Sequence, residues 1–158
     1  MMQNEIERLI DLAKRQVGFK EQPKGSNRGI QVDQYTGGRP EPWCAHFVAW
    51  CFRSIGKPLP NDVVPTPKRA NPLASVSFTE RIFKELDWHY MSPQPGDIVF
   101  FATRGKSDRG PGRHIGIVIA VHHDKIEVVD GNWGDAVNRR FIPLENSKPT
   151  ITGYGRVP

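Results

Sequence analysis

The chain has 158 residues, of which 37% are hydrophobic and 25% are charged, a composition typical of one soluble globular domain. It contains no run of about 18 apolar residues, which excludes a membrane-spanning helix. The formal net charge of +5 favours anionic partners such as nucleic acid, acidic lipid surfaces or anionic cell-wall polymer.

The first predicted element is a helix from Asn4 to Val17, in a charged and amphipathic segment. Asn4 and Glu7 resemble a capping box, apolar residues fall on one face, and Gly18 can end the helix. The segment lacks the apolar core and the cleavage site of a signal peptide. The chain is therefore expected to be made and kept in the cytoplasm, to be the mature form of a longer precursor, or to leave the cell by a route that reads no signal, and we expect the last of these for action at the cell wall. Residues 19–42 are rich in Gly, Pro and Asn and are predicted to form a loop.

The second predicted helix begins at Pro42 or Trp43 and ends near Ser54 or Ile55, before Gly56. Proline suits a first helical position, because the N–H that it lacks would have no partner there. Apolar residues cover nearly the whole circumference, so this helix is predicted to be buried nearly all round.

In the second half of the chain, the spacing of apolar residues changes from one typical of helices to one typical of strands. Residues 57–76 contain five prolines and predict an extended loop, and Ser77 with Glu80 predicts a short helix that ends near Leu86. Five segments rich in Val, Ile and Phe then predict strands: Asp97–Ala102, Ile115–His122, Lys125–Asp130, Ala136–Ile142 and Ile151–Tyr154. Helices followed by strands predict an α+β fold, with N-terminal helices packed on a C-terminal antiparallel sheet in a single domain, residues 1–158.

Two cysteines, Cys44 and Cys51, lie in the second predicted helix. Seven residues of helix rise by roughly 10.5 Å, whereas a disulfide needs Cα atoms closer than about 7 Å, so both are predicted to be free thiols. Cys44 lies in the first turn, where unpaired N–H groups and the helix dipole stabilise a thiolate. Cys51 lies mid-helix and is predicted to be a buried small hydrophobe. Cys44 is therefore the candidate nucleophile.

A cysteine nucleophile needs a base, and His114 is the best candidate among the histidines. It begins the strand HIGIVIAV directly after a Gly-rich loop, where a rigid sheet supports it. His46 lies about 200° around the helix from Cys44 and is predicted to point elsewhere. The other histidines are predicted to lie at or near the surface: His89, His122 and His123.

The next strand, IEVVDGN, supplies a third group. A three-residue turn at 122–124 would place the side chains of four cross-strand pairs on one face. These pairs are Ala120 with Ile126, Val118 with Val128, Gly116 with Asp130 and His114 with Asn132. A two-residue turn would direct Asp130 and Asn132 away from His114.

The same face has room for a helix, because the side chains of Gly116 and Ala120 are small. The helix that carries Cys44 is predicted to lie across it. A thiol, an imidazole and a carboxylate or carboxamide would then meet.

The blocks PWCAHFVAW, PGDIVFF, HIGIVIAV and VVDGNWGDAV resemble, in this order, the CHAP family of cysteine- and histidine-dependent amidohydrolases and peptidases. The stretch AKRQVGFKEQPKGSNRGIQVDQY also resembles the run before the cysteine in that family, so the likeness covers nearly the whole chain. It implies a papain-like fold and hydrolysis of an amide bond in bacterial peptidoglycan. It also implies that Cys44 is the nucleophile, His114 the base, Asp130 the acidic partner and Asn132 the amide partner.

The sequence departs from the family in two places. Many members have Glu where Asp130 stands, so either Asp130 or Asn132 could orient the imidazole. Some relatives bind calcium through closely spaced aspartates before the cysteine, but Asp33 has few acidic neighbours here. We therefore expect no metal and no other cofactor.

The implied chemistry is acyl transfer through a thioester. The backbone N–H of Cys44 can donate to the oxyanion, and Tyr35 is a candidate for the second donor. Trp43 and Trp133 are candidates for contact with substrate, with Trp133 at the rim of the cleft, where it could pack on a sugar or a peptide.

Basic residues crowd the loop before the base, where they could attract the carboxylates of wall stem peptides: Arg104, Lys106, Arg109 and Arg113. Nucleic acid is not expected, because this loop lacks interleaved aromatic residues. We expect a monomer that acts on peptidoglycan at the cell wall or in the periplasm without inserting into a membrane. An immunity protein would be a further partner of a toxin.

Three alternatives compete with a wall hydrolase. A zinc site of Cys44, His46, Cys51 and another histidine fits no common zinc spacing. A catalytically inactive wall-binding module of the same fold remains open, as does a papain-like protease, deamidase or acyltransferase with another substrate. The sequence also leaves open which amide bond is cut, and whether the setting is a phage lysin, a tail-associated enzyme or a secreted toxin.

Overall fold

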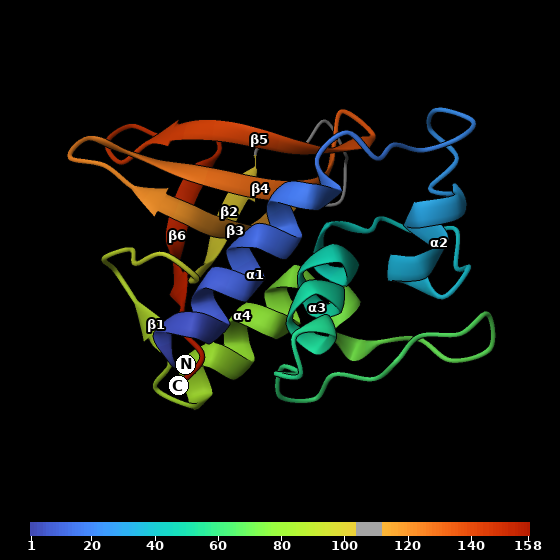
Figure 1. The fold of residues 1–158 in the computed structure, drawn as a ribbon, viewed down its shortest axis with the longest axis horizontal. Coiled ribbons are helices and arrows are strands. Elements are labelled where there is room, and N and C mark those ends of the chain that lie inside the picture. Colours follow the sequence, from blue (N-terminus) through green and yellow to red (C-terminus); the bar gives the residue numbers. More distant parts are fainter. Residues whose placement is uncertain (104–111) are drawn as a thin grey trace.

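The structure is a computed structural model that describes residues 1–103 and 112–158. Within these residues the chain forms four α-helices, one short 3-10 helix and six β-strands (Figure 1). The helices are α1 (Gln3–Gln16), α2 (Ile30–Thr36), α3 (Cys44–Ser54), η1 (Pro72–Ala74) and α4 (Val76–Glu85). The strands are β1 (His89–Tyr90), β2 (Ile98–Thr103), β3 (Gly112–Val121), β4 (Lys125–Trp133), β5 (Ala136–Pro143) and β6 (Thr150–Gly155). Three residues of the basic loop lie outside the described residues: Arg104, Lys106 and Arg109.

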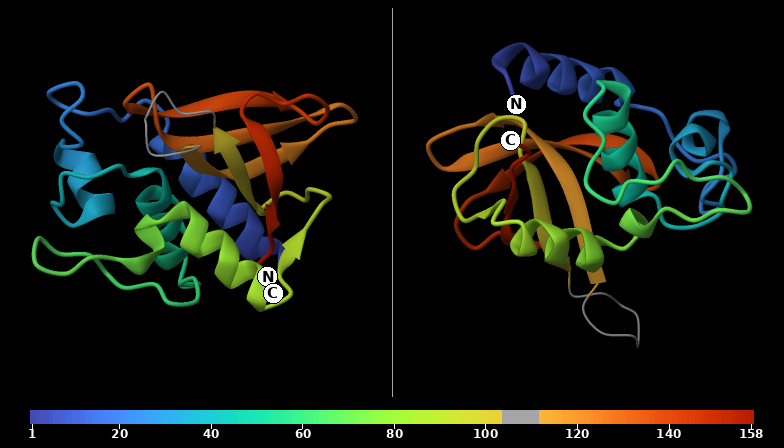
Figure 2. Two further views of the ribbon diagram at one scale, coloured as in Figure 1. Left: turned by 180° about the vertical axis from the view of Figure 1, so that it is seen from behind. Right: turned by 90° about the horizontal axis from the view of Figure 1, so that it is seen from below.

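The strands form one antiparallel sheet in the order β1-β6-β2-β3-β4-β5. Helices α1, α3 and α4 pack against β3, and α3 also packs against β4 (Figures 1 and 2). The predicted α+β fold, with N-terminal helices on a C-terminal antiparallel sheet, is confirmed. In the described parts of the chain, no helix is long and apolar enough to cross a membrane.

The helices α1 and α4 each begin one residue earlier than predicted, because their caps differ from those expected. At α1, the carboxylate of Glu5 rather than Glu7 accepts a hydrogen bond from the backbone N–H of Met2, at 2.8 Å. At α4, the hydroxyl of Ser75 accepts from the N–H of Phe78, at 3.2 Å. Both are local hydrogen bonds that satisfy N–H groups at a helix start.

The predicted loop at 19–42 is wrong in part, because it contains α2. This helix has only 7 residues, and its first apolar side chain, Ile30, is 91% exposed. Val32 and Tyr35 are fully buried, but two buried positions are too few to give a helical period in the sequence. The predicted loop at 57–76 likewise contains the short helix η1.

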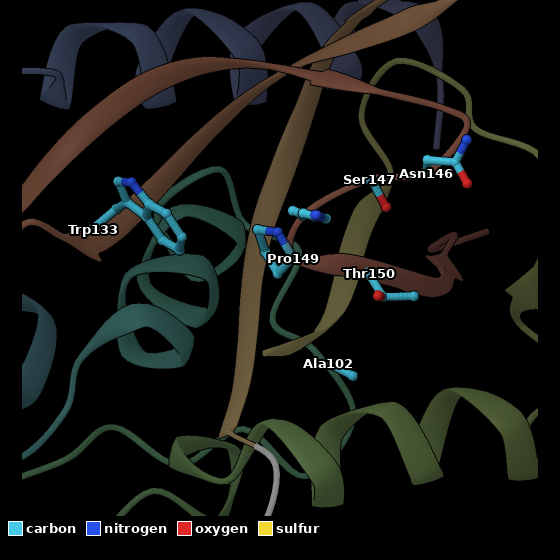
Figure 3. Close-up of a pocket in the computed structure, with 7 residues that line it drawn as sticks. Ala102, Trp133, Asn146, Ser147, Pro149 and Thr150 are labelled. Carbon is cyan, nitrogen blue, oxygen red and sulfur yellow. The ribbon is translucent and has the colours of Figure 1, made fainter. Parts of the chain in front are cut away.

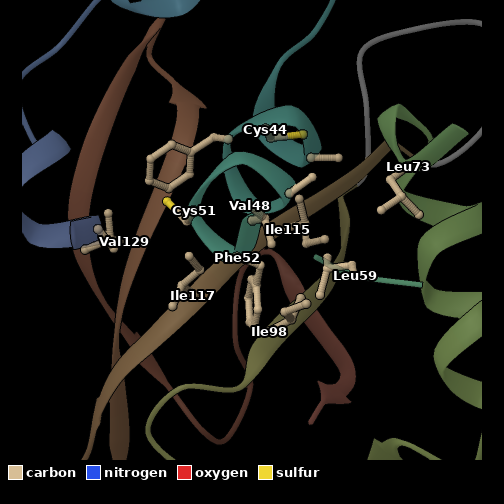
Figure 4. Packing of buried hydrophobic residues seen from close by; sticks show 14 of the residues in the cluster. Cys44, Val48, Cys51, Phe52, Leu59, Leu73, Ile98, Ile115, Ile117 and Val129 are labelled. Carbon is tan, nitrogen blue, oxygen red and sulfur yellow. The ribbon is translucent and has the colours of Figure 1, made fainter. Parts of the chain in front are cut away.

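Helix α3 lies at the centre of the main hydrophobic core (Figure 4). Val48 and Phe52 pack on this side of the sheet in one cluster with Ile115, Ile117 and Val129. Burial of each such side chain contributes roughly 1.5–3 kcal/mol. The core therefore fixes α3 firmly on β3 and β4, as its apolar circumference predicts.

The β3–β4 register agrees with the prediction only at the end of the ladder near the site. Val118 faces Val128 as predicted, but Ala120 faces Glu127 rather than Ile126. An irregularity between Val118 and Ala120 accounts for the difference, since a bulge adds one residue to one strand. The predicted three-residue turn is therefore wrong, while the pairing nearer the site is unaffected.

The predicted face for α3 is also wrong, because α3 packs on the face opposite Gly116 and Ala120. A small residue does permit the approach, but it is Gly131. A Cβ atom added there would lie 2.8 Å from both Phe47 Cβ and Trp43 Cζ3. The predicted face is filled by a second apolar cluster of sheet residues: Val99, Phe101, Val118, Ile126, Val128, Ile142 and Tyr154.

Candidate active site

Cys44 is the first residue of α3, and its side chain lies at the N-terminal end of the helix (Figure 4). The residue before it, Trp43, makes no side-chain cap. The first N–H groups of a helix have no partner within it, so they can donate to a developing anion. Cys51 is fully buried, and burial raises the pKa of its thiol well above the ordinary value. The two thiols are free, and only Cys44 lies where a thiolate is stabilised.

His114 lies near the start of β3 and is 6% exposed. Its Nε2 atom lies 2.9 Å from Oδ2 of Asp130, which leaves Nδ1 as the ring nitrogen that can exchange a proton with the thiol. Burial lowers the pKa of His114, but hydrogen bonds with Asp130 and Cys44 and their negative charges outweigh it and raise the pKa to about 9. The three side chains therefore interact as one charged group.

The carboxylate of Asp130 is fully buried and has a second cationic partner, Arg140 from β5. The Nε atom of Arg140 lies 3.2 Å from Oδ1 and 3.0 Å from Oδ2, and its Nη2 also donates to Oδ2. A buried carboxylate needs such partners, because it has lost its hydration. Asp130 thus lies between an imidazole and a guanidinium.

Asn132 lies close in sequence but does not share this network. Its backbone is left-handed, with φ of 59°, and its side chain is only partly buried. Among the described residues no hydrogen bond joins Asn132 to His114, whose Nε2 is occupied by Asp130. The geometry therefore brings together the thiol, the imidazole and the acid, and leaves the amide aside.

Trp133 lies at the rim of the site and is 36% exposed. Its ring centroid is 5.2 Å from that of His114, and the guanidinium carbon of Arg140 lies 3.7 Å from the centroid of its rings. Trp133 also lines a pocket of about 680 Å³, and Figure 3 shows it pointing toward Pro149. The pocket is also lined by Ala102, Asn146, Ser147, Lys148, Pro149 and Thr150. Trp133 thus joins this pocket to the catalytic imidazole, although neither Cys44 nor His114 lines it.

The CHAP domain family model matches residues 34–132, more than half of the chain. The chain belongs to the CHAP family. This membership indicates an amidase or peptidase that acts on peptidoglycan, and the α+β architecture is consistent with the papain-like fold of CHAP domains. No curated protein matches the chain.

In this CHAP domain, Tyr35 and Trp43 lie in the hydrophobic core that also contains Cys44. Both are fully buried and their rings stack at 5.7 Å. The hydroxyl of Tyr35 donates to Gln16 at 2.7 Å, and the indole N–H of Trp43 donates to Glu21 at 2.8 Å. The polar groups of both residues are therefore already engaged, unlike the exposed ring of Trp133.

Arg113, the one basic-loop residue that the structure describes, is the second residue of β3 and pairs with the buried carboxylate of Glu80. Its Nη2 also donates to the hydroxyl of Thr152, at 3.3 Å. This arrangement commits the guanidinium to the interior of the CHAP domain rather than to a wall carboxylate.

Sequence reasoning missed Arg140. On β5 it faces Val128, two residues from Asp130 along β4. A diagonal cross-strand neighbour of this kind lies within reach of a long side chain. Pairing β5 with β4 through the turn after Trp133 would have found it.

Across the parts of the chain that the structure describes, no group of three or more His, Cys, Asp or Glu residues could hold a metal.

Proposed function

We propose that the protein is a peptidoglycan hydrolase that cleaves an amide bond of the bacterial cell wall through a thioester on Cys44. It acts as an N-acetylmuramoyl-L-alanine amidase or as an endopeptidase of the peptide cross-link. One observation carries the proposal: a helix-start thiol interacts with a buried imidazole that a buried carboxylate holds from its other side.

The first half of the reaction forms the thioester. The thiolate of Cys44 attacks the amide carbonyl, and the backbone N–H of Cys44 donates to the oxyanion that develops. The imidazolium of His114 then gives its Nδ1 proton to the leaving amine, so that the amine departs neutral. A raised pKa of about 9 keeps this proton on the ring at neutral pH until it is needed.

The second half releases the acid. The neutral imidazole of His114 takes a proton from water, the resulting hydroxide attacks the thioester carbonyl, and the thiolate leaves. The proton on the ring restores the ion pair. Asp130 holds the Nε2–H tautomer throughout and stabilises the charged ring.

The pocket beside Trp133 offers a place for part of the substrate. A ring with 36% of its surface exposed, next to the catalytic imidazole, can pack against a sugar or a peptide group. We propose that the protein acts as a monomer at the cell wall or in the periplasm. If it is a toxin, its partner is an immunity protein.

Mass spectrometry of the fragments released from defined peptidoglycan tests this function and names the bond. An amidase releases peptides from the glycan, whereas an endopeptidase shortens the cross-links and leaves peptides on the sugars. Cys44→Ala is the inactive control and Cys51→Ala the matched active one. A wild-type protein that binds peptidoglycan but releases no fragment would favour an inactive binding module.

A further inference from the structure

We propose that Arg140 is a positioning residue of the catalytic site. It acts through Asp130, whose carboxylate it holds in place, and it ties the pocket wall at Trp133 to Cys44 and His114. The inference rests on the proposed cysteine hydrolase. It adds a residue that lies outside the matched family range of 34–132.

The bonds to Asp130 carry the first step. Arg140 donates to both carboxylate oxygens and shares Oδ2 with His114, whose Nε2 lies 2.9 Å away. The hydrogen bonds from the planar guanidinium fix the orientation of the Asp130 carboxylate. This orientation in turn determines the direction of the imidazole that is bonded to it. Without Arg140, this fully buried carboxylate would lose these bonds, and of its hydrogen bonds to side chains of the described residues it would keep the one with His114.

Arg140 also contacts Trp133, a residue of the pocket wall. The guanidinium lies over the indole at 3.7 Å, and its side chain is only 15% exposed. The same guanidinium lies 6.0 Å from the ring centroid of Phe101. It therefore contacts the pocket wall at Trp133 while it bonds the carboxylate of Asp130.

The charged groups that face His114 are few. In the described residues they are Cys44 from α3 and Asp130 from β4, with Arg140 from β5 behind the acid. The neighbour from β2 is Phe101, whose ring lies 6.0 Å from the imidazole. Loss of Arg140 removes a cation from this group, so the negative charge of Asp130 would act on the imidazole with no guanidinium beside it.

The adjacent residue offers a matched control. Arg139 also reaches from β5 to an acid on β4, with its Nε 2.7 Å from Oε1 of Glu127. That pair has no thiol and bonds His122 instead of His114. Removal of Arg139 costs a similar ion pair between the same strands, away from the site.

The experiment measures kcat/KM against pH on defined peptidoglycan for wild type, Arg140→Met, Arg140→Lys and Arg139→Met. We expect Arg140→Met to lower kcat/KM on the order of 10-fold, as a small misplacement of a catalytic group does. The acidic limb of its profile of kcat/KM against pH should move to higher pH, because the variant lacks a cation beside the thiol and the imidazole. Arg140→Lys should restore the position of the acidic limb, because lysine keeps the positive charge. It should restore only part of kcat/KM, because an ammonium group cannot make the two-pronged hydrogen bonds of a guanidinium. Arg139→Met should change neither.

A double variant separates positioning from a role in folding. In an Asp130→Asn background, Arg140→Met should cost less than about 2-fold, because its target is gone. An equal loss in both backgrounds, with an unmoved acid limb, would overturn the proposal. Near-ultraviolet circular dichroism checks that each variant is folded.

The pH dependence of Cys44 alkylation by iodoacetamide gives a readout that needs no peptidoglycan. The pH range in which the alkylation rate falls on acidification should shift in Arg140→Met and should not shift in Arg139→Met. If wild type hydrolyses no peptidoglycan while this shift is present, the proposed substrate fails and the role of Arg140 stands. If alkylation does not shift, the role of Arg140 fails whatever the substrate.

Discussion

Two groups lie along β3, β4 and β5, and each consists of a carboxylate, an imidazole and a guanidinium. Near one end, Asp130 bonds His114 and Arg140, and near the other end Glu127 bonds His122 and Arg139. They differ in burial. The side chains of His114 and Arg140 are 7% and 15% exposed, against 43% and 48% for His122 and Arg139. Their neighbours also differ, because His114 interacts with the thiol of Cys44 and His122 has no thiol beside it among the described residues.

This comparison shows that composition does not make a catalytic group. Burial raises the pKa of Glu127, but hydrogen bonds from Arg139 and His122 outweigh it and lower the pKa. That is the ordinary behaviour of an ion pair close to solvent, which contributes at most about 1 kcal/mol. The group around His114 is shielded from water, so each charge there acts strongly on the next. The position of α3 over one end of the sheet decides which group receives the nucleophile.

The largest contrast is expected between the two histidines. His114→Ala should lower kcat on peptidoglycan about 10³-fold, because it removes the group that moves the proton. His122→Ala should leave kcat within about 2-fold, since its imidazole lies by the turn between β3 and β4. Rates of fragment release measure both. Equal losses in the two variants would show that the comparison misidentifies the site.

The two acids should differ next most. Asp130→Asn is expected to lower kcat about 10²-fold, because the amide neither fixes the charged ring nor favours its protonated form. Glu127→Gln, at the equivalent place in the other group, should retain nearly full activity. The same assay with both proteins at equal folded concentration measures the difference. A Glu127→Gln variant as impaired as Asp130→Asn would contradict the assignment.

The pH dependence sharpens the contrast further. Activity should fall above about pH 9, where the imidazolium of His114 loses its proton. The folded pKa lies above the ordinary 6.5, so protonation of His114 stabilises the fold fully below that value, and this stability is lost as the pH rises through about 9. In Asp130→Asn both the alkaline limb of activity and this stability change should move to lower pH. An alkaline limb that stays in place would mean that Asp130 does not raise the pKa of His114.

The smallest expected effect concerns stability. Arg139→Met should lower the free energy of unfolding by at most about 1 kcal/mol, because the Arg139 side chain is 48% exposed and its charge is screened by solvent. Arg140→Met should cost more, on the order of 3 kcal/mol, since it leaves a buried carboxylate short of a partner. Urea denaturation measures both values. Equal costs would remove the distinction between a buried and an exposed group.

The sequence predicted the elements that follow from strong periodicity. Helix α3 has an almost continuous apolar circumference, and the strands alternate clearly, so their existence and order were correct. Helix α2 was missed because Ile30 is exposed and its two buried residues give no period. The face of the sheet that α3 covers was predicted wrongly. Gly116 and Gly131 are equally small, so residue size alone could not identify the face. The second apolar cluster of the structure fills the face of Gly116, and α3 covers the face of Gly131.

The site was predictable where it depended on local chemistry. A helix-start cysteine and a strand-start histidine can be recognised from their positions, and the structure brings Cys44 and His114 together. Contacts between side chains that are far apart in sequence could not be recognised in this way. The engagement of Tyr35 by Gln16 depends on how α1 packs against α2, and the approach of Arg140 to Asp130 depends on the β4–β5 register.

The most direct test compares the two thiols in catalysis. The rate of amide cleavage in purified peptidoglycan should fall to background in Cys44→Ala and remain at the wild-type level in Cys51→Ala. Undiminished cleavage by Cys44→Ala would contradict the account, because the nucleophile would then lie elsewhere.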